Sequence, residues 1–357
     1  MGAGPAVAPR ELVRLTSLRA FAAGLVFVFH LLATFRWQPA RYAIDGYAGV
    51  AFFFVLSGFV LTWSLGDRPI DVRRFYRARF ARIYPAYAVC LVVAWAITPA
   101  VAWWVVVANT ALVQAWFPSA RDLGHSIDLP SWSVSCEITF YALLPLLVLA
   151  ARRWSELRCL VVASAWFAVC ALVTYEVPRH GDAFRWGHIV YINPAVRSGE
   201  FVLGIAACRL VQSGRLRRLR VSWSLVAVVA SYVVLYQWDG RPFPMADVFL
   251  TPASFALICA AAHADIARRP GPLTSKPLRY LGEISYSFYV FQFIPLLLIK
   301  DHVHASAAAR SAWALVATLA GTVVLHHAVE RPLRAAITHR PQPPAASLVP
   351  EPEVVSS

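Results

Sequence analysis

The sequence predicts an all-α fold, a polytopic membrane bundle with about ten transmembrane helices. Two observations carry this prediction. Of the 357 residues, 59% are apolar and only 15% are charged, and the mean hydropathy is +0.57. Soluble domains have about 25% charged residues, so the composition excludes an ordinary soluble enzyme, a disordered chain and a disulfide scaffold. The apolar residues also fall into separate runs near the length that a hydrocarbon core of ~30 Å requires.

Ten apolar runs are predicted to cross the bilayer as helices. They cover residues 15–37, 47–65, 83–98, 137–151, 158–177, 194–211, 222–238, 246–265, 280–299 and 309–328. A further run, 101–117, follows Pro99, and we expect it to be a non-spanning segment or one arm of a broken helix. No convincing cleavage site follows the first run, which is therefore predicted to stay as an anchor.

The basic residues indicate an orientation in the membrane. Lys and Arg number 33 against 19 Asp and Glu, which gives a formal net charge of +14. They gather in the connections 68–82, 152–158, 209–220 and 268–279 and in the tail after Arg331. Because cytoplasmic loops carry the excess of Lys and Arg, we expect these connections and both termini to be cytoplasmic, in the inner (cytoplasmic) membrane of a bacterial cell.

The chain divides into three predicted parts. These are a cytoplasmic N-terminal segment 1–14, a membrane domain 15–334 and a disordered, Pro-rich cytoplasmic tail 335–357. The six cysteines form no CxxC pair and are expected to be buried thiols. No histidine pair stands at metal-ligand spacing with a carboxylate, so the sequence predicts neither a metal nor a permanently bound cofactor.

Two ionisable residues, Arg19 and His30, lie within the first run. Ionisable groups inside a bilayer are costly and usually functional. Eleven residues advance a helix by about 16 Å and close to three turns, so both side chains lie on one face and should point to a common cavity or partner helix. The alternative for His30 is an ordinary packing residue.

Arginines and aromatic residues alternate from Arg73 to Pro85, at a predicted cytoplasmic helix start. One interpretation is an orientation signal that also contacts anionic lipid headgroups. The other is a phosphate clamp, because guanidinium groups bind phosphate oxygens bidentately.

A third polar stretch, Leu129 to Tyr141, runs from a loop into a predicted helix. Glu137 and Tyr141 are four residues apart and share a helix face. Ser133 or Ser135 is expected to cap this helix. Glu137 could accept a hydrogen bond from a substrate hydroxyl or orient a histidine.

Six short motifs, in order along the chain, resemble those of the acyltransferase 3 family of integral membrane O-acyltransferases. They are Arg19 with His30, the phrase Phe53-Phe54-Val55-Leu56-Ser57-Gly58-Phe59, Arg79 and Arg82 before Tyr84-Pro85, Trp132-Ser133 with Glu137 and Phe140-Tyr141, Gly199-Glu200 with Gly204, and Ser285-Tyr286-Ser287 with Tyr289. Two positions depart from the family's pattern. Ala51 stands where the family usually has Asp, and Gln292 stands where it commonly has His. Gln can form hydrogen bonds but cannot titrate.

The resemblance implies transfer of an acyl group, acetyl or another short acyl, from cytoplasmic acyl-CoA to a hydroxyl of a carbohydrate or glycosylated small molecule. His30 would take the acceptor proton, and Arg19 would hold the donor or stabilise the oxyanion. A covalent acyl-histidine relay stays open. The expected donor-binding residues are Arg79, Arg82 and Arg77. Glu137 is expected to act with the acceptor-binding residues Trp132, Ser133, Tyr141 and Gln292.

The acceptor and the class of protein leave alternatives open. The chain ends soon after the last run, so we expect a stand-alone acyltransferase. The resemblance implies macrolides or exported saccharides as acceptors of such stand-alone members. The Arg-rich, Lys-poor composition suggests a GC-rich bacterium, which raises the macrolide option. A proton-coupled transporter of a sugar or anion is the main alternative, although the sequence shows no two-fold repeat of hydropathy. A lipid-organising protein would leave Arg19, His30 and Glu137 unexplained.

Overall fold

The computed structural model describes residues 11–37, 46–98, 101–117, 126–180, 183–238 and 245–338. The chain is helical in all of these ranges, and they contain no strand. The all-α prediction is therefore confirmed. Residues 335–338 of the predicted tail continue the last helix, whereas the rest of that tail and residues 1–10 lie outside the described residues.

Helices coincide with all ten predicted spans. They are α1 (Val13–Thr34), α3 (Tyr47–Leu65), α4 (Val72–Ile97), α6 (Trp132–Arg152), α7 (Glu156–Glu176), α9 (Pro194–Gln212), α10 (Val221–Gln237), α11 (Ala246–Ile266), the broken span α12 (Lys276–Glu283), α13 (Ser285–Phe291) and α14 (Phe293–His302), and α15 (Ala307–Leu325). Within the described ranges, seven helices are long and apolar enough to cross a membrane, and the broken span makes an eighth. Helix α10 is shorter, and α9 carries a buried ion pair, Arg197 with Asp247 of α11.

The remaining elements are short. They are α5 (Trp103–Thr110), η1 (Gln114–Trp116), η2 (Leu129–Ser131), η3 (Val177–His180), α8 (Ala183–Ile192), η4 (Pro272–Thr274), the π-helical turn η5 (His326–Glu330) and α16 (Arg331–Thr338). The run 101–117 forms α5 and η1, and eight helical residues reach only about 12 Å. This segment therefore does not span, and the hydroxyl of Tyr87 in α4 donates to the Asn109 carbonyl 2.8 Å away, which ties α5 to α4.

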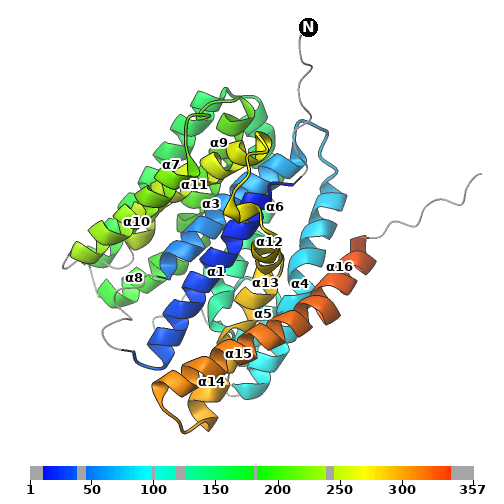
Figure 1. Cartoon of the computed structure of the whole chain (residues 1–357), viewed down its shortest axis with the longest axis vertical. Coiled ribbons are helices and arrows are strands. Elements are labelled where there is room, and N and C mark those ends of the chain that lie inside the picture. Colours follow the sequence, from blue (N-terminus) through cyan, green and yellow to red (C-terminus); the bar gives the residue numbers. More distant parts are fainter. Residues whose placement is uncertain are drawn as a thin grey trace, which may run out of the picture.

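Helix α1 lies in the middle of the bundle (Figure 1). It contacts α3 and α11 on one side and α12, α13 and α14 on the other. Helices α3 and α9 cross closely because Gly58 and Gly204 face the partner backbone. A Cβ on Gly204 would lie 2.0 Å from the Val55 carbonyl oxygen, and one on Gly58 would lie 2.0 Å from that of Phe201. Small residues allow such close approach of helices in membranes.

Two helices begin earlier than the sequence predicts. Helix α4 begins at Val72, where the Asp71 side chain accepts a hydrogen bond from the Arg74 amide, so its arginines stand on the helix itself. Helix α6 begins at Trp132, directly after η2, so Ser133 and Ser135 lie inside it. The expectation that either serine caps the helix is wrong, because Ser133 Oγ donates to the Pro130 carbonyl oxygen at 2.9 Å instead of accepting from an amide.

Candidate active site

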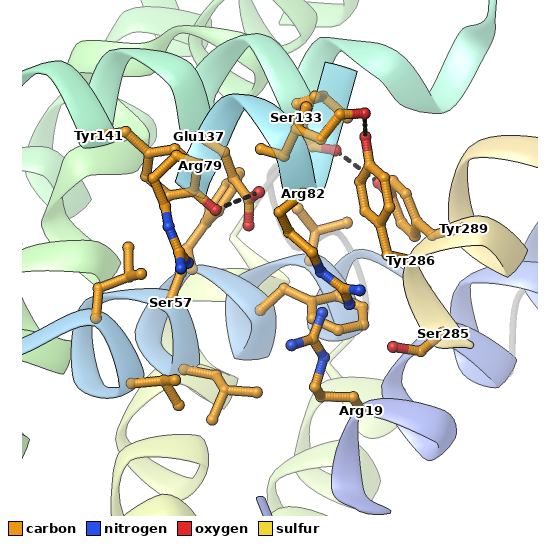
Figure 2. A pocket seen from close by; sticks show the side chains of 18 residues that line it. Arg19, Ser57, Arg79, Arg82, Ser133, Glu137, Tyr141, Ser285, Tyr286 and Tyr289 are labelled. Atoms are coloured by element: carbon orange, nitrogen blue, oxygen red, sulfur yellow. Dashed lines mark hydrogen bonds between the residues drawn. The ribbon is translucent and has the colours of Figure 1, made fainter. Parts of the chain in front are cut away.

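Five helical segments line a cavity of about 100 Å³, which we call the arginine cavity (Figure 2). It is lined by Arg19 of α1, by Val50, Phe53, Phe54, Leu56, Ser57, Val60 and Leu61 of α3, by Arg79, Arg82 and Ile83 of α4, by Ser133, Val134, Glu137 and Tyr141 of α6, and by Ser285, Tyr286 and Tyr289 of α13. The early start of α4 places Arg79 and Arg82 one turn apart on the face that meets this cavity.

Three guanidinium groups converge on the arginine cavity. Figure 2 shows Arg19 reaching from α1 toward Arg82, with Arg79 on the side of Tyr141. The Nε atoms of Arg19 and Arg79 are buried and have no hydrogen-bond partner among the described residues. Arg334 of α16 lies close enough to Arg79 and Arg82 to act on them electrostatically. The cavity therefore carries an excess of positive charge and of unused N–H donors.

Hydrogen bonds fix the polar groups on the α6 side. Tyr141 donates to Glu137 Oε2 at 3.0 Å, and the carboxylate acts electrostatically on Arg19, Arg79 and Arg82. The hydroxyls of Ser133 and Tyr289 lie 2.8 Å apart. Glu137 and Tyr141 share a face, as the spacing predicts.

Glu330 does not line the arginine cavity but binds one of the arginines that do. It is 1% exposed and pairs with Arg82, while Ser287 Oγ lies 2.6 Å and His326 Nδ1 3.0 Å from its Oε2. Glu330 is not among the site residues that the sequence predicts. Charge pairing could have predicted the role of Glu330. A carboxylate in or near the bilayer needs a cationic partner, and the arginines of α4 are candidates for that partner.

His30 lines a second cavity, of about 330 Å³, which we call the histidine cavity. It is lined by Val26, Phe29, His30, Ala33, Thr34, Gly46, Val50, Leu129, Pro130, Trp132, His188, Tyr191, Tyr289 and Phe293. The imidazole ring lies 5.6 Å from that of Phe293, edge to face. Gln292 lies close enough to act on this imidazole, and His30 Nδ1 is buried without a hydrogen-bond partner among the described residues.

The common cavity expected for Arg19 and His30 is not found, and the alternative of a common partner helix stays a prediction. Arg19 lines the arginine cavity and His30 the histidine cavity. The two side chains do lie along one side of α1, but the distance of about 16 Å between them leaves room for a partition. Val50 and Tyr289 line both cavities and form that partition.

The remaining predicted site residues divide between the two cavities. Ser133 and Tyr141 line the arginine cavity, whereas Trp132 lines the histidine cavity and packs on Tyr191 at 4.7 Å. Gln292 is fully buried and lines neither cavity; its Nε2 donates to the Tyr289 carbonyl oxygen at 3.1 Å. Arg77 is exposed and lies outside both cavities.

Two features of the described residues bear on metals and thiols. No group of three or more His, Cys, Asp or Glu side chains in these ranges could hold a metal ion. All six cysteines are buried and free. The expectation of buried thiols is confirmed.

Comparison with known proteins decides the family. The model of an acyltransferase domain, acyltransferase 3, matches residues 12–327. The chain belongs to this family. It is a membrane-embedded O-acyltransferase, because the membrane spans and the family match fall on the same residues.

Named relatives support the same family. The acyltransferase MdmB of Streptomyces mycarofaciens is 32% identical, over 91% of this chain and 92% of that protein. The putative peptidoglycan O-acetyltransferase YrhL of Bacillus subtilis is 26% identical, over 91% of this chain and 55% of its own length. The exopolysaccharide production protein ExoZ of Rhizobium meliloti is 26% identical, over 81% of this chain and 89% of that protein. No solved structure matches this acyltransferase significantly.

Proposed function

We propose that this acyltransferase moves a short acyl group from acyl-CoA to a hydroxyl of a carbohydrate or of a glycosylated natural product such as a macrolide. The observation that carries the proposal is the pair of adjoining cavities. One gathers cations suited to a phosphate-bearing donor, and the other holds an imidazole among aromatic rings.

The arginine cavity suits the donor. Acyl-CoA carries several phosphate oxygens and a thioester on a flexible arm. Arg79 and Arg82 would hold the phosphates through charge-assisted, bidentate hydrogen bonds. Arg19 would bind deeper along the arm, and Glu137 would set the positions of the guanidinium groups. CoA acts as the carrier of the transferred group and leaves after each turnover.

The histidine cavity suits a saccharide acceptor. Ligand pockets combine aromatic walls with a few polar groups that fix orientation. Here Phe29, Trp132, Tyr191 and Phe293 supply the aromatic walls, and the polar groups include the imidazoles of His30 and His188. The names of two relatives, a peptidoglycan O-acetyltransferase and an exopolysaccharide production protein, refer to glycans. A glycosylated macrolide presents the same sugar hydroxyl.

The reaction requires a base for the acceptor hydroxyl. The acceptor oxygen forms a bond to the acyl carbonyl carbon, and the carbon–sulfur bond breaks. His30 takes the hydroxyl proton, and the CoA thiolate that leaves takes a proton to become the free thiol. General base catalysis of this kind contributes typically 10²–10⁴-fold. Gln292, which acts on the imidazole, cannot titrate, so in this proposal His30 alone moves the proton.

The orientation follows from the basic connections. Helix α4 begins in the arginine-rich connection 68–82, so the arginine cavity would open to the cytoplasm, where acyl-CoA is made. The histidine cavity, bounded by the opposite end of α1, would open toward the outer face of the cell membrane.

The test is a donor and acceptor assay in membranes that contain the protein. Incubation with acetyl-CoA and a set of saccharides and glycosylated macrolides should release free CoA thiol only when a suitable acceptor is present. Mass spectrometry should then find one added acetyl group on that acceptor. Uptake of an acceptor into vesicles without thiol release would contradict the proposal and favour a carrier.

A further inference from the structure

Tyr289 is the one aromatic side chain within the described residues that lines both cavities. It is 7% exposed, and its ring packs edge to face on Phe53 at 5.9 Å. The other shared residue, Val50, has a short side chain and lies in the uninterrupted helix α3. The aromatic ring of Tyr289 is therefore the part of the partition that a side-chain movement could displace.

The hydroxyl of Tyr289 holds the ring in place. It lies 2.8 Å from Ser133 Oγ and 3.4 Å from the Pro130 carbonyl oxygen, so both of its contacts are on the polar stretch at the start of α6. Neighbouring residues of that first turn face opposite cavities, with Trp132 in the histidine cavity and Ser133 in the arginine cavity. Figure 2 shows the bond between Ser133 and Tyr289 at the edge of the arginine cavity.

The element that carries Tyr289 is short and interrupted. Helix α13 has seven residues and lies between breaks in the chain's broken span, which bends by 47° between α12 and the segment from Ser285 to His302. Small changes at such breaks reorient a short helix without disturbing the long ones.

Transfer between the cavities requires the partition to open. Reacting atoms must approach to about 3–3.5 Å, whereas a thioester in the arginine cavity and His30 in the histidine cavity are on opposite sides of Tyr289. We propose that Tyr289 is a gate, latched by Ser133, that closes the passage between the two cavities and swings aside to admit the acyl end of the donor. This rests on the proposed function for the identity of what passes. When closed, the gate keeps water in the histidine cavity away from the thioester.

A cysteine accessibility experiment tests the gate without relying on activity. The six buried native cysteines are replaced by alanine, and Ser57→Cys places a thiol in the arginine cavity. Right-side-out and inside-out membrane vesicles are then treated with a membrane-impermeant methanethiosulfonate reagent. With Tyr289 intact, we expect labelling from one side only. With Tyr289→Ala, we expect labelling from both sides.

The matched control is Tyr286→Ala. Tyr286 is on the same short helix and its hydroxyl donates to the Ile83 carbonyl oxygen at 2.8 Å, but it lines only the arginine cavity. We expect this variant to be labelled from one side. Identical one-sided labelling of Tyr289→Ala and Tyr286→Ala would overturn the gate, as would two-sided labelling with Tyr289 intact.

Two milder variants keep the test decisive if Tyr289→Ala fails to fold. Tyr289→Phe and Ser133→Ala keep the aromatic ring and remove its hydrogen bond to the start of α6. The thiol introduced by Ser57→Cys should then be labelled from the second side of the membrane more slowly than in Tyr289→Ala, but faster than with Tyr289 and Ser133 intact. Unchanged one-sided labelling in both would contradict the latch. The labelling also separates the two proposals, because a gate can be confirmed in a protein that acylates none of the acceptors tried, and acyl transfer can be found in a protein whose Tyr289 does not gate.

Discussion

Arg82 connects the arginine cavity to a network behind it. Its guanidinium pairs with Glu330, lies 5.5 Å from the centre of the Tyr286 ring and points toward Arg19. Removing one partner of a buried ion pair leaves an uncompensated charge, which destabilises a protein more than replacing both partners by apolar residues. Arg82 is therefore held in one position before a donor arrives, which reduces the entropy lost on binding.

The arginines of α4 should separate into binding and non-binding positions. We expect Arg79→Ala and Arg82→Ala to lower kcat/KM for acyl-CoA by roughly 10- to 100-fold, mainly through KM, since a hydrogen bond to a charged group contributes about 1.5–3 kcal/mol. Arg82→Ala should also lower the stability of the protein, because it leaves the buried Glu330 without its cation. Arg77→Ala should resemble Arg73→Ala, because both side chains are exposed on the same helix. A decrease in kcat/KM in Arg77→Ala equal to that in Arg82→Ala would show that Arg77 binds the donor, as the sequence predicts, although its side chain lies outside the arginine cavity.

Asp128 should make stability depend on pH. Burial raises the pKa of its carboxyl well above its usual range, and neither oxygen has a hydrogen-bond partner among the described residues. The titratable groups close enough to interact with it are those of Tyr87, Cys90 and Tyr289, which are neutral at neutral pH. The folded protein therefore keeps a proton that the unfolded chain releases above about pH 4, and stability falls as the pH rises toward the raised pKa.

The neutral variant Asp128→Asn removes this dependence. Its thermal unfolding temperature in detergent should exceed that of the unaltered protein at pH 8, and the difference should shrink toward pH 5. A difference of the same size at both pH values would show that Asp128 is not the group responsible.

Residue-scale predictions from sequence succeeded where a charge stood in an apolar run. Arg19, His30 and Glu137 were recognised because ionisable groups are rare in membrane helices, and each of them lines a cavity. Tyr289 and Glu330 could not be placed in the same way. Their roles depend on contacts with Ser133 and Arg82, which are 156 and 248 residues away in the chain.

At the scale of helices, close packing of α3 on α9 fixes the wall of the arginine cavity. The glycines that allow it belong to the motifs Ser57-Gly58 and Gly199-Glu200 with Gly204. These motifs therefore have a structural explanation in addition to any catalytic one, because the α3 residues from Val50 to Leu61 line the cavity from this position.

Gly204→Ala should destabilise the protein. Its new methyl would meet the backbone of α3, and forcing an extra carbon into a well-packed core costs typically 1–3 kcal/mol. Gly24→Ala is the matched control, because a Cβ on Gly24 meets nothing within 4 Å and alanine favours a helix. Thermal unfolding in detergent should show a clear decrease for Gly204→Ala alone. Equal effects of the two substitutions would contradict the close approach of α3 and α9.

The positions of the helices followed from hydropathy, since every predicted span coincides with a helix or a broken helix. Within the described ranges, seven helices and the broken span are long and apolar enough to cross a membrane, so α9 and α10 fall short of the ten predicted spans. Three details did not follow. The break at Ile284 between α12 and α13 was not predicted, although Gly282 and Ser285 flank it, because the surrounding run has the hydropathy of one continuous span. The early starts of α4 and α6 place arginines and serines on helices that line the arginine cavity, whereas a hydropathy pattern assigns these residues to loops. The predicted cap at Ser133 failed for the same reason.

At the scale of the whole molecule, the cluster of arginines and the imidazole of His30 lie in separate cavities, on opposite sides of Tyr289. In the proposed function, the donor binds on the arginine side and the acceptor on the imidazole side. This separation could not be predicted from the sequence, where Arg19 and His30 share a helix face and invite a single site. It distinguishes this acyltransferase from an enzyme with one pocket, because binding of CoA and use of the acceptor should depend on different residues.

The measurement that tests this account most directly is acyl transfer by His30→Ala alongside its affinity for CoA. We expect CoA binding, followed by calorimetry on the purified protein, to be unchanged, and acceptor-dependent thiol release to fall by about 10²–10⁴-fold. His188→Ala, which removes the other imidazole of the histidine cavity, should retain most of the transfer rate. Undiminished product from His30→Ala, or a loss of transfer confined to His188→Ala, would contradict the account.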